Sequence, residues 1–169
     1  MIYNIIVAFD INRGIGINNN LPWNIPDDLK HFSKLTRGNG NNAIIMGKNT
    51  WNSLPKKPLP KRDNLILSST LNINDNSPKN NLVKSFNNIK SIYKFCEEQK
   101  YDTVWIIGGS KIYEQFINES IINKLYITFI LNEYECDTYF PSISNWKLDE
   151  NIVQKFYNNI SVYYQIYTK

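Results

Sequence analysis

The stretch AIIMGKNTW, residues 43–51, joins an apolar run to a glycine and then to a polar segment. The apolar run has the aliphatic character of a strand that is covered on both faces. Gly47 allows a tight turn after it, and Lys48, Asn49 and Thr50 bring a charge, an amide and a hydroxyl to the start of a helix. A strand, a glycine turn and a helix in this order predict an α/β domain, and such a helix start suits a phosphate group.

The same alternation of strand-like and helix-like segments continues along the chain. Apolar runs of strand length lie at 4–9, 64–69, 103–109 and 124–130. Helix-like segments lie at 26–36, 49–54, 88–98 and 110–117. We therefore predict an α/β fold with a central, mostly parallel twisted sheet and flanking helices. The tail contains ISVYYQIYT at 160–168, and we expect two late strands to form a C-terminal antiparallel hairpin at a sheet edge.

Length and composition indicate one globular unit. The chain has 169 residues, and no internal repeat or linker divides it, so residues 1–169 are expected to form a single domain. With 42% hydrophobic and 14% aromatic residues it can fill a packed core. The net charge of +4 is scattered and forms no basic stripe, which argues against a nucleic-acid partner and only weakly favours small anionic ligands.

The cysteines and the N-terminus bear on the location of the protein. Cys96 and Cys136 have no partner spacing typical of a zinc site, so we expect no bound metal and a reducing compartment. The N-terminal MIYNIIVAFD is apolar, but it lacks a basic leader and soon reaches Asp10. It predicts a first strand instead of a signal peptide or membrane span. We therefore expect a cytoplasmic protein with no membrane partner.

Two neighbouring acids open the helix predicted after NNNLPWNIP. Asp27 and Asp28 follow Pro26, which suits the first turn of a helix because its missing N–H would be unpaired there anyway. Acids in a first turn also complement the positive end of the helix dipole. Helix capping alone is therefore an adequate explanation for the pair.

Helical geometry nevertheless separates the two acids. At about 100° per residue, Phe32 and Leu35 flank Asp28 closely and Leu29 lies further round the same side. Asp27 points roughly a quarter-turn away, towards solvent. No Lys or Arg lies at a helical spacing that would reach Asp28, and an unpartnered acid among apolar residues is costly to bury. We therefore expect Asp28 to bind a ligand.

Two further strand ends resemble the one at Gly47. LILSS at 65–69 ends in two hydroxyls, and VWIIGGSKIYEQF at 104–116 passes through Gly108 and Gly109 into a helix. None of the three is a G-x-G-x-x-G or Walker loop, and each alone is weak evidence for ligand binding. Together they predict ligand binding at the carboxyl edge of the sheet, where open α/β sheets bind ligands. Lys48 suits an extra phosphate such as the one that distinguishes NADP from NAD.

The whole chain resembles the dihydrofolate reductase family. The motifs that carry the resemblance are IVAFDINRGIG (6–16), LPWNIPDDLKHF (21–32), IIMGKNTWNSLP (44–55), PLPKRDNLILSS (58–69), VWIIGGSKIYEQF (104–116), LYITFI (125–130) and DTYFP (137–141). The resemblance implies NADPH-dependent reduction of 7,8-dihydrofolate to 5,6,7,8-tetrahydrofolate, an oxidoreductase step that supports one-carbon metabolism and thymidylate synthesis. It also implies dihydrofolate as the substrate, antifolates as inhibitors and a monomeric protein.

The resemblance assigns the substrate side of the site by position. Asp28 matches the family's acid that binds the pterin, Thr128 would support it by a hydrogen bond, and residues 10–24 match a mobile loop. The catalytic assignments are Asp28, Leu21, Trp23 and Thr128. The substrate-binding assignments are Ile6, Val7, Ala8, Asp28, Leu29, Phe32, Leu54, Lys57, Arg62, Ile107 and Thr128. Arg62 would pair with the α-carboxylate of the glutamate tail, for which a planar fork is suited.

The resemblance assigns the NADPH side in the same way. The cofactor-binding assignments are Ala8, Ile15, Gly16, Asn20, Gly47, Lys48, Asn49, Thr50, Ser68, Ser69, Lys84, Ile107, Gly108, Gly109, Ser110, Lys111, Ile112, Tyr113 and Gln115. Gly108 and Gly109 match a pair joined by a cis peptide. Lys48 stands where Arg is common and Asn49 where a His or basic residue is frequent, so the adenosine phosphate would be held by a point charge.

Two other functions compete with this interpretation. A reductase of the riboflavin pathway that acts on a phosphoribosyl-aminopyrimidine shares the fold, although Arg62 and the stretch from Trp23 to Asp28 argue against it. A catalytically silent NADPH-binding protein is the alternative of a different class. Binding without turnover would distinguish it from an enzyme.

Overall fold

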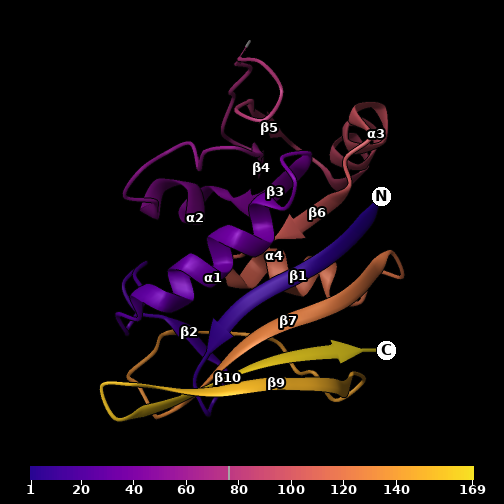
Figure 1. Ribbon diagram of the computed structural model, residues 1–169. Coiled ribbons are helices and arrows are strands. Elements are labelled where there is room, and N and C mark those ends of the chain that lie inside the picture. Colours follow the sequence, from indigo (N-terminus) through magenta and orange to yellow (C-terminus); the bar gives the residue numbers. More distant parts are fainter. Residues whose placement is uncertain (76) are drawn as a thin grey trace.

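The computed structural model, which describes residues 1–75 and 77–169, has an eight-stranded sheet in the order β5-β4-β3-β6-β1-β7-β10-β9 (Figure 1). The parallel strands are β1 (Ile2–Phe9), β3 (Asn42–Gly47), β4 (Asp63–Leu67), β5 (Val83–Phe86), β6 (Thr103–Ile106) and β7 (Ile122–Leu131). The antiparallel hairpin is formed by β9 (Lys147–Tyr157) and β10 (Ile160–Thr168), and it joins the sheet through β7. The predicted α/β fold is confirmed.

The helices cover both faces of this sheet (Figure 1). They are α1 (Pro26–Arg37), α2 (Lys48–Ser53), α3 (Ile89–Gln99) and α4 (Ser110–Phe116). On one face, Phe32 of α1 packs with Ile44 and Met46 of β3. On the other face, Phe116 of α4 packs with Ile45. Successive side chains of β3 therefore enter two different cores, which explains why its sequence is continuously apolar.

A second, two-stranded sheet joins β2 (Gly14–Gly16) to β8 (Thr138–Tyr139). Between β2 and α1 the chain makes a tight turn in which Asn18 and Asn19 both have positive φ, at 49° and 60°. The backbones of Ile17 and Asn20 pair across this turn. Neither short strand is predictable from the sequence, because segments this short carry no measurable periodicity.

Several element boundaries differ from the predictions. The strand predicted over 103–109 ends at Ile106, because the following residues lead into a cis peptide between Gly108 and Gly109. Strand β5 lacks an apolar run and is absent from the predictions. Strand β9 is only implied by the expected hairpin, because an edge strand with exposed residues reads as polar sequence. Within the described residues, no helix is long and apolar enough to cross a membrane.

Candidate active site

The first turn of α1 places one of its two acids against the sheet. Asp28 is 9% exposed, whereas Asp27 is exposed, as the helical geometry predicts. The hydroxyl of Thr128 on β7 donates a hydrogen bond of 2.7 Å to Oδ1 of Asp28. Thr128 is itself 4% exposed and lies beside Ala8 of β1 in the parallel register. The predicted hydrogen bond is therefore present, and no cation partners Asp28 among the described residues.

The electrostatics of Asp28 follow from this burial. Loss of solvent raises the pKa of the Asp28 carboxyl above its ordinary value, and the hydrogen bond from Thr128 opposes that shift. Only Oδ1 has a hydrogen-bond donor in the described part of the chain. The second oxygen thus remains available to a donor from a ligand.

The predicted residues on β1 divide between the two faces of the sheet. Ile6 packs with the α1 side of the core, and Ala8 packs against the cluster that contains Trp23. Val7 is buried on the opposite face with Ile5, because side chains of a strand alternate. The side chain of Val7 therefore does not share a surface with Asp28, and only its backbone is available to this site.

The loop before α1 brings further predicted residues to the same side. Trp23 is buried, and its ring meets that of Tyr134 edge-on with 5.3 Å between centroids. Its indole N–H has no partner among the described residues. Leu21, by contrast, is 53% exposed, and Asn20 is exposed as well. The tryptophan is thus fixed by packing, while the preceding residues lie at the surface.

A residue that the sequence analysis does not assign to the site, Asp137, connects this loop to β8. Its carboxylate accepts a hydrogen bond of 2.9 Å from the backbone N–H of Asn18, and its own N–H donates to the carbonyl of Gly16 at 2.9 Å. A Cβ on Gly16 would lie 2.9 Å from Oγ1 of Thr138, so glycine permits the close approach of the two strands. The motif DTYFP contains Asp137, but its spacing from residue 18 gives no signal of the contact.

Arg62 lies just before β4, at the far end of α1 from Asp28. It is 2% exposed, donates from Nε to the carbonyl of Pro60 at 3.0 Å, and donates from Nη1 to the hydroxyl of Thr36. Burial and the nearby charge of Arg37 lower its pKa to about 10. No carboxylate partners Arg62 within the described residues. A buried guanidinium of this kind suits an anionic ligand group.

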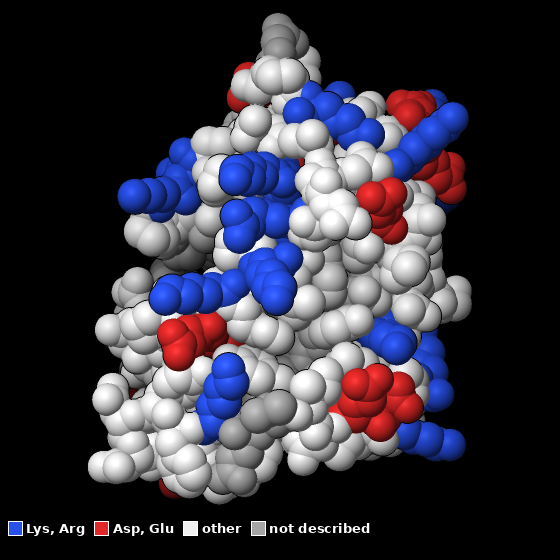
Figure 2. All heavy atoms as spheres, in the orientation of Figure 1, with Lys and Arg blue, Asp and Glu red and all other residues white. Residues whose placement is uncertain are grey.

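The surface outside Arg62 is also cationic. Lys30 and Lys34 are exposed on α1, and Arg37 is half-buried at its end, where Nε donates to the carbonyl of Ser33. Figure 2 shows Lys and Arg side chains gathered over the part of this face where α1 lies. The surroundings of Arg62 therefore favour negatively charged groups.

The glycine turns meet at the carboxyl edge of the sheet. The N–H of Gly47 donates to the carbonyl of Gly108 at 2.8 Å. A Cβ on Gly109 would lie 3.4 Å from Oγ1 of Thr50, and one on Gly108 would lie 2.9 Å from the ring of Tyr113. The predicted cis peptide between the two glycines is present. The glycines therefore permit close packing of α2 and α4 against these turns.

Tyr113 connects this edge to the acid side of the site. It is buried, and its hydroxyl donates a hydrogen bond of 2.9 Å to the carbonyl of Ile6. Ile112, also buried, packs under Gly47, where an added Cβ would be only 3.0 Å away. Both residues are therefore positioned to support the backbone of the site more than to line it.

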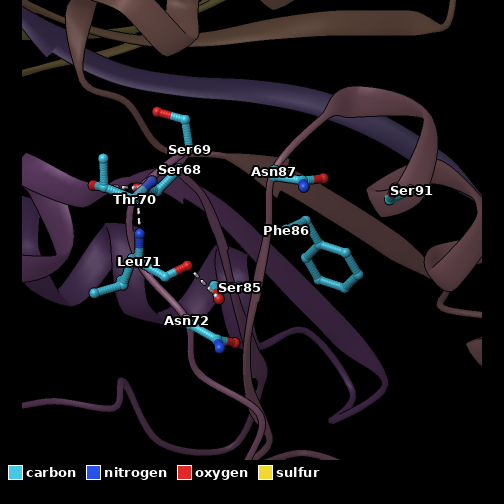
Figure 3. Close-up of a pocket in the computed structure, with 9 residues that line it drawn as sticks. All are labelled: Ser68, Ser69, Thr70, Leu71, Asn72, Ser85, Phe86, Asn87 and Ser91. Carbon is cyan, nitrogen blue, oxygen red and sulfur yellow. Dashed lines mark hydrogen bonds between the residues drawn. The ribbon is translucent and has the colours of Figure 1, made fainter.

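A polar cavity of about 440 Å³ adjoins the same edge. Its lining comes from the segment after β4, from β5 and from the start of α3, as Figure 3 shows, and consists of Ser68, Ser69, Thr70, Leu71, Asn72, Ser85, Phe86, Asn87 and Ser91. Lys48 reaches the cavity wall, with Nζ 3.1 Å from Oγ1 of Thr70. Lys84 instead lies over the rings of Phe86 and Phe95, at 5.6 and 4.9 Å from their centroids.

The remaining predicted residues have mixed positions. Phe32, Leu54 and Ile107 are half-buried and pack on the α1 side of the core, next to Ile6. Leu29 is 53% exposed. Exposed positions are also found for Asn49, Lys57, Ser69, Lys111 and Gln115, and half-buried ones for Ile15, Thr50, Ser68 and Ser110. Lys57 lies over the ring of Trp51 at 5.5 Å, on the side of α2.

The fold and these residues define an α/β protein that combines a buried acid with a glycine-rich, hydroxyl-lined edge of a parallel sheet. The family model for dihydrofolate reductase matches residues 2–169. The chain is 41% identical over 148 residues to a dihydrofolate reductase of Drosophila melanogaster, with 83% of this chain and 80% of that protein covered. It is 33% identical over 180 aligned positions to one of Heliothis virescens, with 98% and 96% covered. A viral dihydrofolate reductase of Saimiriine herpesvirus 2 is 41% identical over 157 residues, with 88% and 73% covered. The chain belongs to the dihydrofolate reductase family.

Proposed function

We infer that the protein reduces 7,8-dihydrofolate to 5,6,7,8-tetrahydrofolate with NADPH as the hydride donor. The observation that carries this inference at the site is Asp28, a buried acid whose Oδ1 accepts from Thr128 and whose other oxygen has no donor among the described residues. A pterin ring offers a ring N–H and an exocyclic amino group side by side, which match a carboxylate. Asp28 would orient the ring through these donors.

The residues at the carboxyl edge fit a dinucleotide phosphate. The turns at Gly47 and Gly108 lie at the starts of α2 and α4, hydroxyls line the adjoining cavity, and Lys48 contacts the wall of that cavity through Thr70. We assign the cavity of Figure 3 to the adenosine end and the paired glycine turns to the diphosphate. NADPH, when bound, supplies the hydride that the chemistry requires.

The protein's part in the reaction is positioning and electrostatics. Asp28 would fix the orientation of the heterocycle and favour its protonation, while Trp23, Phe32 and Leu54 would exclude water around it. The proton for the substrate would come from solvent, and Asp28 need not reach the reacting nitrogen. Closure of residues 10–24 would gate access, so loop opening or product release would limit turnover.

Arg62 would bind the α-carboxylate of the glutamate tail. It is buried and cationic, and it has no acid partner among the described residues. The charges of α1 would attract the same tail from solution. We further propose a monomeric, cytoplasmic enzyme that is inhibited by antifolates, whose amino-substituted heterocycles would donate to Asp28.

An assay of NADPH oxidation tests this function. Addition of dihydrofolate should cause a loss of absorbance that depends on both reactants. The aminopyrimidine of riboflavin synthesis, supplied in a parallel reaction, should give none. Turnover of the aminopyrimidine alone would instead establish the rival reductase, and NADPH binding without turnover of either compound would establish the silent protein.

A further inference from the structure

The two halves of α1 are attached to the sheet in different ways. In the C-terminal half, Leu35 packs with the core around Ile44, and the carbonyl of Thr36 accepts a hydrogen bond of 3.0 Å from Asn42. At its other end the N-cap residue, Ile25, makes no capping hydrogen bond through its side chain. Ile25 is 4% exposed and belongs to the same apolar cluster as Tyr164 of β10. Phe32 of the second turn packs on β3, so the first turn, which carries Asp28, depends most on contacts with β7 and β10.

Two such contacts lie next to each other. The first is the hydrogen bond from Thr128 to Asp28. The second joins His31 to Tyr164, whose ring centroids are 4.0 Å apart with 34° between their planes. Thr128 and Tyr164 are direct partners in the antiparallel register of β7 and β10, so their side chains are neighbours on one face. Asp28 and His31 are neighbours on the helix, since they lie one turn apart.

The four residues thus form a closed arrangement, with two on the helix and two on the sheet. We propose that the His31–Tyr164 ring pair positions the Asp28 carboxylate for substrate binding by fixing the first turns of α1 on β10. This inference rests on the proposed function, and it gives His31 a positioning role, since its ring is not placed against the reacting atoms. Loss of the ring contact would let the first turn move and displace the free oxygen of Asp28.

The charges around His31 agree with this role. Burial lowers the pKa of His31, and the nearby cations Lys155 of β9 and Lys34 of α1 lower it further. The ring is therefore neutral at neutral pH and packs as an aromatic group. Burial raises the pKa of the Tyr164 hydroxyl, and its neighbours Tyr157, Asp28 and Asp27 raise that pKa further. A neutral His31 adds no positive charge that would counter the raised pKa of Asp28.

Substitution at His31 tests the proposal against a purely structural role. His31→Ala removes the ring, His31→Phe keeps a ring of similar shape, and Lys94→Ala, an exposed position of α3 outside the assigned site, is the control. An aromatic pair is worth about 0.5–1.5 kcal/mol, so we expect kcat/KM for dihydrofolate to fall about 2- to 12-fold in His31→Ala. The KM for NADPH should stay unchanged, and His31→Phe should restore most of the loss.

A second readout follows the acid itself. If the first turn loosens, water reaches Asp28 and its pKa moves down towards the ordinary value, so the acid limb of the pH profile should shift to lower pH in His31→Ala. The melting temperature of each variant is measured alongside, and Tyr164→Leu removes the other ring if His31→Ala folds poorly. An unchanged KM for dihydrofolate and acid limb, with only a lower melting temperature, would overturn the proposal. Equal impairment of His31→Phe and His31→Ala would overturn it as well.

The wild-type assay reports on the proposed function independently, since it involves no substitution.

Discussion

The acid end and the dinucleotide end of the site differ in burial and in composition. At the acid end, Asp28 and Thr128 are both nearly inaccessible and are surrounded by packed side chains. At the dinucleotide end, glycine turns and a hydroxyl-lined cavity leave most of the polar groups at the surface, with Lys48 exposed. At the acid end, substrate binding depends on a single carboxylate. At the dinucleotide end, cofactor binding is shared among many polar groups, each of which contributes little. Substitutions should therefore have large effects at the first end and small effects at the second.

Asp28→Asn should have the largest effect. It keeps the shape of the side chain and removes the charge, so we expect kcat/KM for dihydrofolate to fall about 10²- to 10⁴-fold, the range typical of lost acid–base assistance. Steady-state kinetics at neutral pH measure the loss. Asp27→Asn, one position away and exposed, is the control and should stay near wild type. Equal losses in both variants would remove the distinction between the two acids.

Arg62→Leu is expected to rank second. Removing a charged partner of a carboxylate costs about 1.5–3 kcal/mol, which corresponds to a rise of about 10- to 150-fold in KM for dihydrofolate. A pteridine substrate without a glutamate tail should be reduced with unchanged KM, and the exposed neighbour Lys61 supplies the control as Lys61→Ala. A similar rise for the tail-free substrate would show that Arg62 acts through the fold and does not bind the tail.

Asp137→Ala should have an intermediate effect, through the loop. The variant loses the bond from Asn18 to the carboxylate, worth about 0.5–1.5 kcal/mol, and we expect kcat to fall about 2- to 12-fold. Stopped-flow measurement of the first turnover separates a slower chemical step from slower release of product. Glu135→Ala changes an exposed acid of the same segment and should leave kcat unaltered.

Lys48→Gln tests the dinucleotide end of the site. Exposed ion pairs are worth about 0.2–1 kcal/mol, so KM for NADPH should rise only about 1.5- to 5-fold, with KM for NADH unaffected. Lys90→Gln on α3, outside the assigned site, is the control. A loss as large as that of Asp28→Asn would contradict the contrast between the two ends.

The smallest expected effect concerns stability and has the opposite sign. The pKa of Asp28 is raised in the folded protein, so the folded protein binds this proton more tightly than the unfolded chain does. The resulting penalty is absent below the ordinary pKa, grows as pH rises towards the folded pKa and is fully present above it. Asp28→Asn should therefore melt at a slightly higher temperature than wild type at neutral pH. A lower melting temperature of Asp28→Asn would show that the ionised Asp28 carboxylate does not destabilise the folded protein.

Parts of this contrast are predictable from the sequence. The periodicity of α1 separates Asp28 from Asp27, and the apolar runs predict the parallel strands with the exception of β5. The alternation of β1 also predicts that Val7 faces away from Ile6 and Ala8, a consequence that positional assignment overlooks. Periodicity within one helix or strand gives the direction in which a side chain points. Such directions are therefore predictable without knowledge of which other segments pack nearby.

Contacts between distant segments are not predictable in this way. Thr128 reaches Asp28 from a strand far along the chain, and only the family resemblance predicts that bond. The hydrogen bond from the N–H of Asn18 to the Asp137 carboxylate has no sequence signal, and neither has the ring pair of His31 and Tyr164. Each depends on how two separate segments of the chain pack together. The expected hairpin implies strand β9, but the bounds of β9 are not predictable, because most residues of this edge strand are exposed and lack an alternating pattern.

The most direct test of the central claim is a titration of the Asp28 carboxyl by carbon-13 NMR, with Asp28→Asn used to assign the signal. In the free protein we predict a pKa above the ordinary aspartate value of 3.8, and a signal that changes when dihydrofolate is added. An ordinary or lowered pKa, together with a signal that does not respond to dihydrofolate, would contradict the account.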